Sequence, residues 1–506
     1  MRRLICRRLP AMLLLVLIAA ACHKKPVPIT GPVGPAIPES LIQEFVLEGD
    51  KLFEAMHLYA WRRAEAAYAT AYSMAPRPEI RDKLALAKLL RMTREIDEDI
   101  PCPTVKENIA FICEHPADAR AQALCDLAGA YALTPQAAAE SMKRVDPAVL
   151  HVDTSPLDAY FYALYARTIG SDAKDDTFRR GLHEKYKNSP LFAYLGSGLG
   201  VRLTQQYPDF AEACQSYAES SFQKNSVKAA RTGFTHALAF IPEYTRAQNG
   251  LANIYFFTLE DYDNAFKGYE ASLRWDPQNT GALFGKGASL HHLDRYQESN
   301  AVMDQMLASD LSRNGRVTSN SIQYYRGEAY YYKAHNYHMM NDPVRARELI
   351  DIAKKELPRA EEINYLSGLL YYIAGELAPA KADFEKSVKS GTYCYAYHYL
   401  GMIELSTGGP VAASNFLSCS ACLERGLRNL QERMKAIAGL DIEPNELLAL
   451  RMRMDLRLRE YRDSSVDLIQ RMVALIRDAS MDAKWKQTFV DSMNGLLAKI
   501  QSIGGK

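Results

Sequence analysis

The sequence predicts an all-α fold, an α-solenoid of stacked helix hairpins with a C-terminal helical cap. Three observations predict it. From Leu41 onward, apolar residues recur at helical spacing, Pro, Asp and Gly mark the turns, and two-residue alternation is missing. A pattern of small and aromatic residues recurs in this region with a period near 34 residues. Finally, 48% of the 506 residues are apolar and 24% are charged, which is typical of a chain that packs.

Residues 1–21 are predicted to be a secretion signal. Four arginines, of which Arg8 is the last, precede an uninterrupted apolar run from Ala11 to Ala21. This run would form about 16 Å of helix at about 1.5 Å per residue, too short to cross a bilayer. We therefore expect the segment to be removed and not to remain as a transmembrane helix.

The end of the signal resembles the lipobox of bacterial lipoproteins, because Ala19, Ala20 and Ala21 directly precede Cys22. The resemblance implies that Cys22 becomes the first residue of the mature chain and carries acyl chains such as palmitate. It also implies outer-membrane delivery, facing the periplasm, because His23 stands where an aspartate would favour retention in the inner membrane. The family usually has leucine at the position of Ala19. Ala19 and Ala21 also suit ordinary signal peptidase, which leaves a secreted or soluble periplasmic protein as the alternative.

A proline-rich tether is predicted for residues 22–40. Its prolines exclude a helix or a central strand and favour an extended chain, at positions 26, 28, 32, 35 and 38. At about 3.1 Å per residue, such a tether reaches up to about 55 Å. The folded part should therefore stand away from the membrane.

Residues 41–207 are interpreted as an N-terminal helical region of degenerate hairpins. The repeat pattern occurs there once, at Ala64, Tyr68, Ala71 and Pro76. Between Glu79 and Pro208 the pattern fades although helices continue, for example at Ala117–Ala132, Pro156–Arg167 and Asp175–Lys187.

Residues 208–423 are predicted to be a repeat array. Each copy of the pattern begins with an alanine. A large residue follows four places later, a small residue three places after that, and a proline five places further on. The copies are Ala230, Phe234, Ala237 and Pro242, then Ala265, Tyr269, Ser272 and Pro277, then Ala346, Ile350, Ala353 and Pro358. The spacings from Ala230 through Ala265, Ser299, Ala346, Ala380 and Ala413 are 35, 34, 47, 34 and 33 residues.

These segments resemble tetratricopeptide (TPR) repeats, whose unit of about 34 residues is a pair of antiparallel helices. The clearest copy is Ser367–Val388, which has small, aromatic and turn residues at the positions of the TPR pattern: Gly368, Tyr371, Gly375, Ala380, Phe384 and Ser387. Small residues let helices approach, and aromatic rings fill the space between them. The 47-residue interval predicts either an extended helix around Gly327–Tyr337 or a loop inserted near Arg313–Ser319.

Residues 424–506 are predicted to be the cap that hides the apolar face of the last repeat. A helical apolar stripe supports this prediction: Leu447, Leu450, Met454, Leu458 and Tyr461. Five arginines decorate the same helix and are interpreted as a solvated face, with an anionic-lipid contact as the alternative: Arg451, Arg453, Arg457, Arg459 and Arg462.

The TPR resemblance assigns certain positions of each first helix to the concave side. In this sequence those positions hold mainly aromatic and histidine residues, and we expect them to bind a protein partner: Phe257, Phe284, His291, His292, Tyr324, Tyr331, Tyr332, Tyr365, Tyr372, Tyr395, His398 and Met402. Such side chains suit an amphipathic helix or an extended peptide. They lack the lysine and asparagine cluster of chaperone-type TPR domains, which grips a terminal carboxylate. The alternative is that many of these rings only pack between hairpins.

Catalysis, metal binding, cofactors and nucleic acid are not expected. Short matches to penicillin-binding-protein motifs, such as Lys389–Gly391, fall where no strand can flank a serine. The 61 basic and 60 acidic residues leave no excess positive charge for nucleic acid. Cys102, Cys113 and Cys125 could form one disulfide or stay as buried thiols, and His115 beside Cys113 is a weak metal candidate. The Cys419-x2-Cys422 pair lacks the histidine of a haem attachment site.

The sequence therefore predicts a lipid-anchored TPR scaffold for an envelope complex. The alternative is a ligand-binding helper of a transport system that holds a small apolar molecule in the aromatic groove. An enzyme with a site between Glu79 and Pro208 would require a deep pocket with paired carboxylates or a Cys/His cluster.

Overall fold

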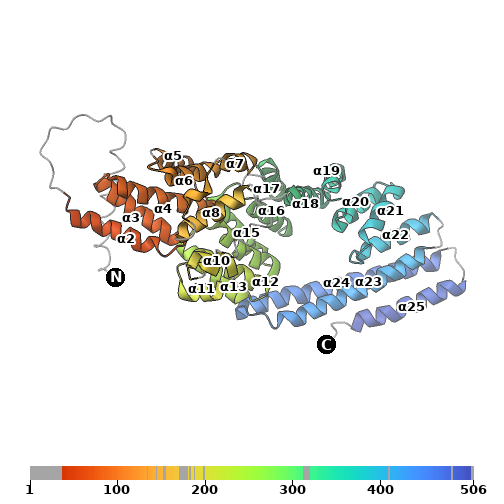
Figure 1. Ribbon diagram of the computed structural model, residues 1–506. Helices are drawn as coiled ribbons and strands as arrows, with labels where there is room; N and C mark the ends of the chain where they lie inside the picture. The colour runs from red at the N-terminus through yellow and green to blue at the C-terminus, as the bar shows by residue number, and fades with distance from the viewer. Residues whose placement is uncertain are drawn as a thin grey trace, which may run out of the picture.

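The computed structural model describes residues 37–502, apart from 115, 134, 144, 152–154, 170–180, 182–183, 187, 198–199, 312–318, 408–410 and 480–482. Within this part of the chain the regular elements are all helices, and consecutive helices pack as antiparallel neighbours (Figure 1). This confirms the predicted all-α solenoid. None of the described helices has the length and apolarity needed to cross a bilayer. The predicted signal, Cys22 and most of the tether lie outside the described residues.

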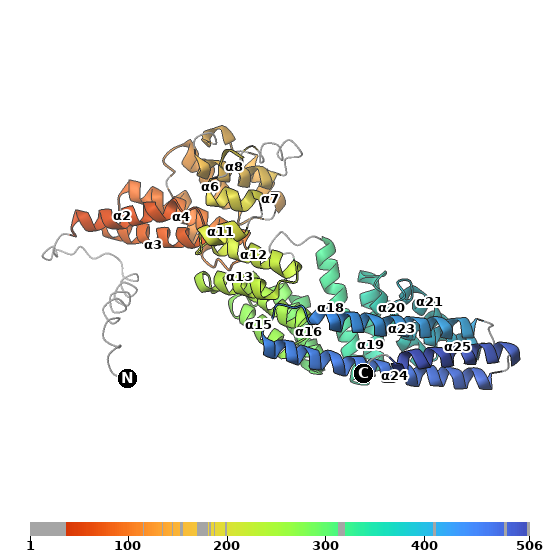
Figure 2. The ribbon, with the colours of Figure 1, turned by 90° about the horizontal axis from the view of Figure 1, so that it is seen from below.

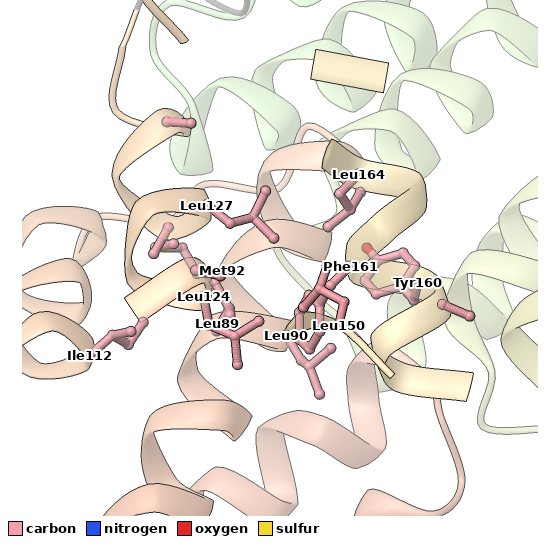
Figure 3. Packing of buried hydrophobic residues seen from close by; sticks show 14 of the residues in the cluster. Leu89, Leu90, Met92, Ile112, Leu124, Leu127, Leu150, Tyr160, Phe161 and Leu164 are labelled. Atoms are coloured by element: carbon pink, nitrogen blue, oxygen red, sulfur yellow. The ribbon is translucent and has the colours of Figure 1, made fainter. Parts of the chain in front are cut away.

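The N-terminal region is a stack of helices around its own core. Its elements are α2 (Glu39–Phe53), α3 (Leu58–Met74), α4 (Pro78–Asp97), α5 (Val105–Cys113), α6 (Ala119–Ala130), α7 (Pro135–Met142), a 3-10 turn (Pro147–Val149), α8 (Pro156–Ile169), α10 (Pro190–Ser197) and α11 (Gly200–Gln206). Figure 3 shows leucines of α4 and α6 packed against Phe161 and Leu164 of α8. The predicted helices at 117–132 and 156–167 thus correspond to α6 and α8, whereas most of 175–187 lies outside the described residues.

The array follows as pairs of first and second helices. They are α12 (Ala211–Gln223) with α13 (Val227–Phe240), α14 (Thr245–Asn253) and the π-helical turn η2 (Ile254–Thr258) with α15 (Tyr262–Trp275), α16 (Thr280–His292) with α17 (Tyr296–Ala308), α18 (Ser319–Met339) with α19 (Pro343–Glu356), α20 (Glu361–Ile373) with α21 (Leu377–Ser387), and α22 (Cys394–Ser406) with α23 (Ala412–Ile437). The 21 residues of α18 agree with the extended helix, one of the two explanations predicted for the long interval; the other, a loop near Arg313–Ser319, falls almost wholly outside the described residues.

The repeated small and large residues form the contacts between helices. Ala230, Phe234 and Ala237 are each at most 1% exposed. Close approach requires glycine at Gly368, where an added Cβ would lie 2.8 Å from the Phe384 ring of the same hairpin. At Gly285 the clash would be with Tyr269 of the preceding hairpin, at 2.3 Å. The pattern therefore specifies packing both within and between hairpins.

The C-terminal helices cover the last hairpin and also return along the array. They are α23, α24 (Pro444–Asp478) and α25 (Ala483–Ser502). We call α23 and α24 the return helices, because both views show them running back from α22 towards α13 and α15 (Figures 1 and 2). Phe489 and Met493 of α25 pack with Phe416 of α23, as a cap should. The α23 helix runs without interruption through the predicted boundary at 423/424.

The near end of the return helices is fixed to the start of the array. Leu450 and Met454 are fully buried in an apolar cluster with helices α12 to α14. Arg453 donates to the Leu259 carbonyl oxygen at 2.7 Å, so the interpretation of the arginines as a solvated face is wrong for this residue. Exposed Arg457 also joins the array, at 3.3 Å from Glu260. Arg459 and Arg462 pair with acids of their own helix, Asp455 and Asp463.

Two disulfides connect neighbouring helices. Cys113–Cys125 joins α5 to α6, and Cys394–Cys422 joins α22 to α23. The thiols of Cys102, Cys214 and Cys419 are free. One pair among Cys102, Cys113 and Cys125 therefore forms, as the sequence allowed. In the second pair, Cys422 is bonded to Cys394 and not to Cys419, its neighbour in the sequence. Burial raises the pKa of the free Cys419 thiol to about 12.

A buried ionic network fixes the N-terminal region to the array. The Arg94 guanidinium of α4 lies 2.7 Å from Glu98 and 3.5 Å from Glu212 of α12. Glu98 also accepts from the Tyr244 hydroxyl at 2.5 Å and pairs with Arg246 of α14 at 3.0 Å. Arg94, Glu98 and Glu212 are 2%, 5% and 0% exposed. Three helices from two regions therefore share one set of buried charges.

Candidate functional site: the concave aromatic face

The twelve predicted partner-binding residues all lie on first helices of the array or on η2, and none is fully buried. Phe257 and Tyr324 are 60% and 48% exposed, and His292 is also exposed. The other nine are half-buried: Phe284, His291, Tyr331, Tyr332, Tyr365, Tyr372, Tyr395, His398 and Met402. We call these twelve residues the concave aromatic face, after the side to which the TPR resemblance assigns them. Their side chains fall into three groups.

The first group lies on η2, α16 and α18. The Phe284 ring contacts the Tyr332 ring edge to face, with centroids 5.7 Å apart. His292 stacks on Tyr262 at 4.3 Å, and His291 lies 5.1 Å from Tyr332. The structure thus brings predicted residues of two hairpins into mutual contact.

The same group also contains neighbouring histidines. The Nδ1 atom of His291 lies 2.6 Å from Oδ1 of buried Asn336, whose amide donates to Ser299 and Asn300. His291 therefore donates this bond from a protonated Nδ1. Sequence reasoning missed His335, whose ring lies 4.9 Å from His291. Burial lowers the pKa of His335 to about 4, with His291 and His338 adding to the effect.

The second group joins α20 to α22. Tyr365 stacks on Tyr393 with centroids 5.5 Å apart, and Tyr372 lies 5.0 Å from Tyr399. The sequence prediction did not assign Tyr393 and Tyr399 to the face. Tyr393 is the N-cap of α22, outside the helical positions that the TPR register assigns, and Tyr399 stacks on the inter-helix ring of Phe384 at 5.2 Å. Some tyrosines therefore pack between helices and also form part of the molecular surface.

The third group faces the C-terminal helices. Tyr395 and Met402 pack against the apolar cluster that α23, α24 and α25 build. His398 lies 5.7 Å from the Phe416 ring, and burial lowers its pKa to about 4, with a smaller effect of Arg471. These three residues therefore pack against neighbouring helices, which is the alternative that the sequence left open for the rings.

Two glutamates lie among the tyrosines of the first and second groups. Glu328 of α18 is 8% exposed, and burial together with the nearby Glu362 of α20 raises its pKa to about 7. The hydroxyl of Tyr393 donates to Glu362 at 3.4 Å. Both carboxylates also act electrostatically on Tyr331 and contribute to raising its pKa. We call Glu328, Glu362, Tyr324, Tyr331 and Tyr393 the carboxyl–tyrosine cluster.

Sequence reasoning missed both glutamates because it searched the face for aromatic rings. A signal was present, since Glu328 stands four residues after Tyr324 and three before Tyr331. That spacing places the three side chains on one face of a helix.

The described residues contain no group of three His, Cys, Asp or Glu side chains placed to hold a metal ion, and His115 lies outside them. A hollow of about 380 Å³ between the N-terminal region and the start of the array is lined by Glu65, Glu95 and Glu243. These carboxylates are ion-paired with Arg62 or Arg91, so they do not form the free acid pair that an enzyme would use.

Comparisons with known proteins give similarity at the level of solved structures. No protein-family model matches the chain, and no curated protein matches its sequence. PilF of Pseudomonas aeruginosa is similar at 18% identity and TM-score 0.36, over 41% of this chain and 89% of that one. A tetratricopeptide repeat protein of Parabacteroides merdae is similar at 15% identity and TM-score 0.33, over 55% and 94%. A chain in the structure of the Cut9–Hcn1 hetero-tetramer of APC/C is similar at 10% identity and TM-score 0.38, over 92% of this chain and 97% of that one. The fold itself is established by the helix packing described above.

Proposed function

We propose that this chain is a lipid-anchored scaffold that faces the periplasm and binds a protein partner of an envelope complex, without catalysis. The exposed part of the concave aromatic face, Phe257, His292 and Tyr324, carries this proposal. Tyrosine, phenylalanine and histidine offer large contact areas with polar edges, and aromatic anchors supply much of the energy of protein interfaces. Successive first helices repeat these anchors along one face, which suits an extended peptide or an amphipathic helix.

The proposed compartment is supported by two independent features. The lipobox-like sequence that ends at Cys22 would anchor the chain through acyl groups, and two or more acyl chains hold a protein durably to a leaflet. The Cys113–Cys125 and Cys394–Cys422 disulfides suit the oxidising periplasm. Together they favour export over a cytoplasmic site.

Alanine at Phe257 and Tyr324 tests the binding face. Because these side chains are 60% and 48% exposed, their removal should leave the thermal stability unchanged. We expect affinity capture from detergent-solubilised envelopes to recover at least about 10-fold less partner with F257A/Y324A than with the wild type.

The matched control is W275A/V344A, which removes two side chains of the second helices that are 49% and 68% exposed. This variant should recover the partner as the wild type does. Equal recovery by both variants would reject the concave aromatic face as the binding surface. A bound small molecule in native mass spectrometry, with no protein partner, would favour the ligand-binding helper.

Serine at Cys22 tests the lipid anchor. We expect the wild-type precursor to accumulate under globomycin, and C22S to lose both this response and its membrane association, because serine cannot form the thioether. Serine at Cys6, inside the predicted signal, is the control and should change neither. Unchanged membrane association of C22S would show that another mechanism anchors the chain.

A further inference from the structure

The carboxyl–tyrosine cluster contains an acid with no partner of its own. Glu328 is 8% exposed, and no described residue hydrogen-bonds to its carboxyl group or pairs with it; its oxygens are not among the fully buried atoms that lack a partner, so they still reach solvent. Buried carboxylates normally have such partners, because losing water without compensation is costly. Lys333, on the same helix, is already paired with Asp304. The unpartnered state of Glu328 therefore needs an explanation.

A second acid on the next first helix adds to the negative charge. Glu362 raises the pKa of Glu328, so the two carboxylates repel each other. Among the described residues, no lysine or arginine pairs with either of them; the nearby Arg326 pairs with Glu356. The cluster is thus acidic and has no internal counter-ion.

Tyrosine rings surround these acids. Tyr324 is 48% exposed and Tyr331 is half-buried, and the pKa values of both are raised in part by Glu328 and Glu362. Tyr393 stacks on Tyr365 and donates to Glu362. Aromatic faces attract cations, and the attraction grows when the cation loses water.

We propose that the carboxyl–tyrosine cluster binds a lysine or arginine side chain of the protein partner. This inference rests on the proposed function, and it adds the chemistry of one anchor residue. The carboxylates would supply the counter-charge and the tyrosine rings would hold the alkyl stem and the cation. A metal ion is a poorer occupant, because two carboxylates without a third acidic or histidine ligand do not complete a coordination shell.

A random 12-residue peptide library displayed on phage is the probe. It would be selected on the intact mature protein, and in parallel on F257A/Y324A. We expect the peptides enriched on the wild type to contain at least one lysine or arginine at a fixed position. The best peptide would then be synthesised and its Kd measured against variants.

The substitution E328Q/E362Q removes both charges and keeps the shape of the side chains. We expect it to weaken the selected peptide by about 10- to 100-fold. The control E348Q/E385Q removes two charges from exposed acids of the second helices α19 and α21, and it should bind as the wild type does. Replacing the basic residue of the peptide with norleucine should weaken wild-type binding, but have little further effect on E328Q/E362Q.

The possible results separate this inference from the proposed function. Peptides that need Phe257 and Tyr324 but contain no fixed basic residue, or that bind E328Q/E362Q with unchanged affinity, would overturn the basic anchor and leave the scaffold proposal standing. Failure to enrich any peptide that depends on Phe257 and Tyr324 would count against both. Tight binding of tetramethylammonium alone, with no enriched peptide, would indicate a small cationic ligand and reject a protein side chain.

Discussion

Substitution of Arg94 by methionine is expected to destabilise the protein by about 3–5 kcal/mol. Arg94 is the only cation within ion-pair distance of Glu212 in the described chain, and Glu212 is 0% exposed. Removing the guanidinium would leave this carboxylate with the Leu58 backbone N–H, at 3.2 Å, as its main support. Urea unfolding of the mature protein, followed by circular dichroism, would measure the loss.

The loss should depend on pH. Burial already raises the pKa of Glu212, and without Arg94 the carboxyl group should escape its charge by staying protonated. We therefore expect R94M to be less destabilised at pH 5 than at pH 8. The double variant R94M/E212Q should recover part of the stability at pH 8, since it removes the orphaned charge as well.

Arg459→Met is the matched control, because Arg459 forms an exposed pair with Asp455 of the same helix. Its cost should stay below about 1 kcal/mol, as for other surface pairs. A similar cost for Arg94 and Arg459, or no benefit from adding E212Q, would contradict the importance assigned to the buried network.

Most of the fold could be predicted because it depends on local patterns. The alanine, aromatic and small positions around Ala230, Phe234 and Ala237 recur at fixed spacing, and each copy specifies one helix hairpin. The interval of 47 residues also predicted extra chain at α18, either in the helix or in a loop before it, and the helix has 21 residues. Such features involve residues close in sequence, which a pattern can reveal.

Long-range contacts could not be predicted in this way. Arg94 and Glu212 are 118 residues apart, and Arg453 and Leu259 are 194 residues apart. Nothing near Arg453 distinguishes it from the solvated arginines of the same helix. The apolar stripe of α24 predicts a buried face, but it does not reveal that Leu450 and Met454 pack against the start of the array.

The candidate site was predictable only in part, for a related reason. The TPR register predicts which residues share a face, but it assumes that every copy has the same helices. The longer α18 carries His335 beyond the last position of the register. Glu328 does fit the register, one residue after Gly327 as Met402 is after Gly401, and was missed because it is not aromatic. Tyr395 and Met402 fit the register, yet the cap packs against them.

Glutamine at Glu328 is expected to stabilise the protein by about 2 kcal/mol at pH 8. Burial and Glu362 raise the pKa of Glu328 from 4.5 to about 7. Between these two pH values the folded protein keeps a proton that the unfolded chain has released, so folding stability falls as the pH rises through this window. At about 1.4 kcal/mol per pKa unit the upper limit is about 3 kcal/mol, and glutamine removes this cost.

Thermal unfolding at pH 5 and pH 8 would measure the effect. E328Q should resemble the wild type at pH 5 and melt at a higher temperature at pH 8. Histidines such as His335, whose pKa is lowered to about 4, have the opposite pH dependence: they reduce the stability of the folded protein as the pH falls below about 6.5. Both proteins contain them, so their effect cancels in the difference. The exposed acid Glu348 provides the control, since E348Q should change stability by less than about 0.5 kcal/mol at either pH. A less stable E328Q at pH 8 would mean that Glu328 has a favourable partner.

The direction of this effect links stability to binding. A carboxyl group that destabilises the free protein at pH 8 is expected where a residue serves a ligand and not the fold. A basic side chain of the partner would supply the missing counter-charge and lower the pKa of Glu328. Saturating basic peptide should therefore raise the melting temperature of the wild type at pH 8 more than that of E328Q, because only the wild type has the charge to compensate. If the peptide stabilised both proteins equally, the cost of Glu328 would be unrelated to the cation.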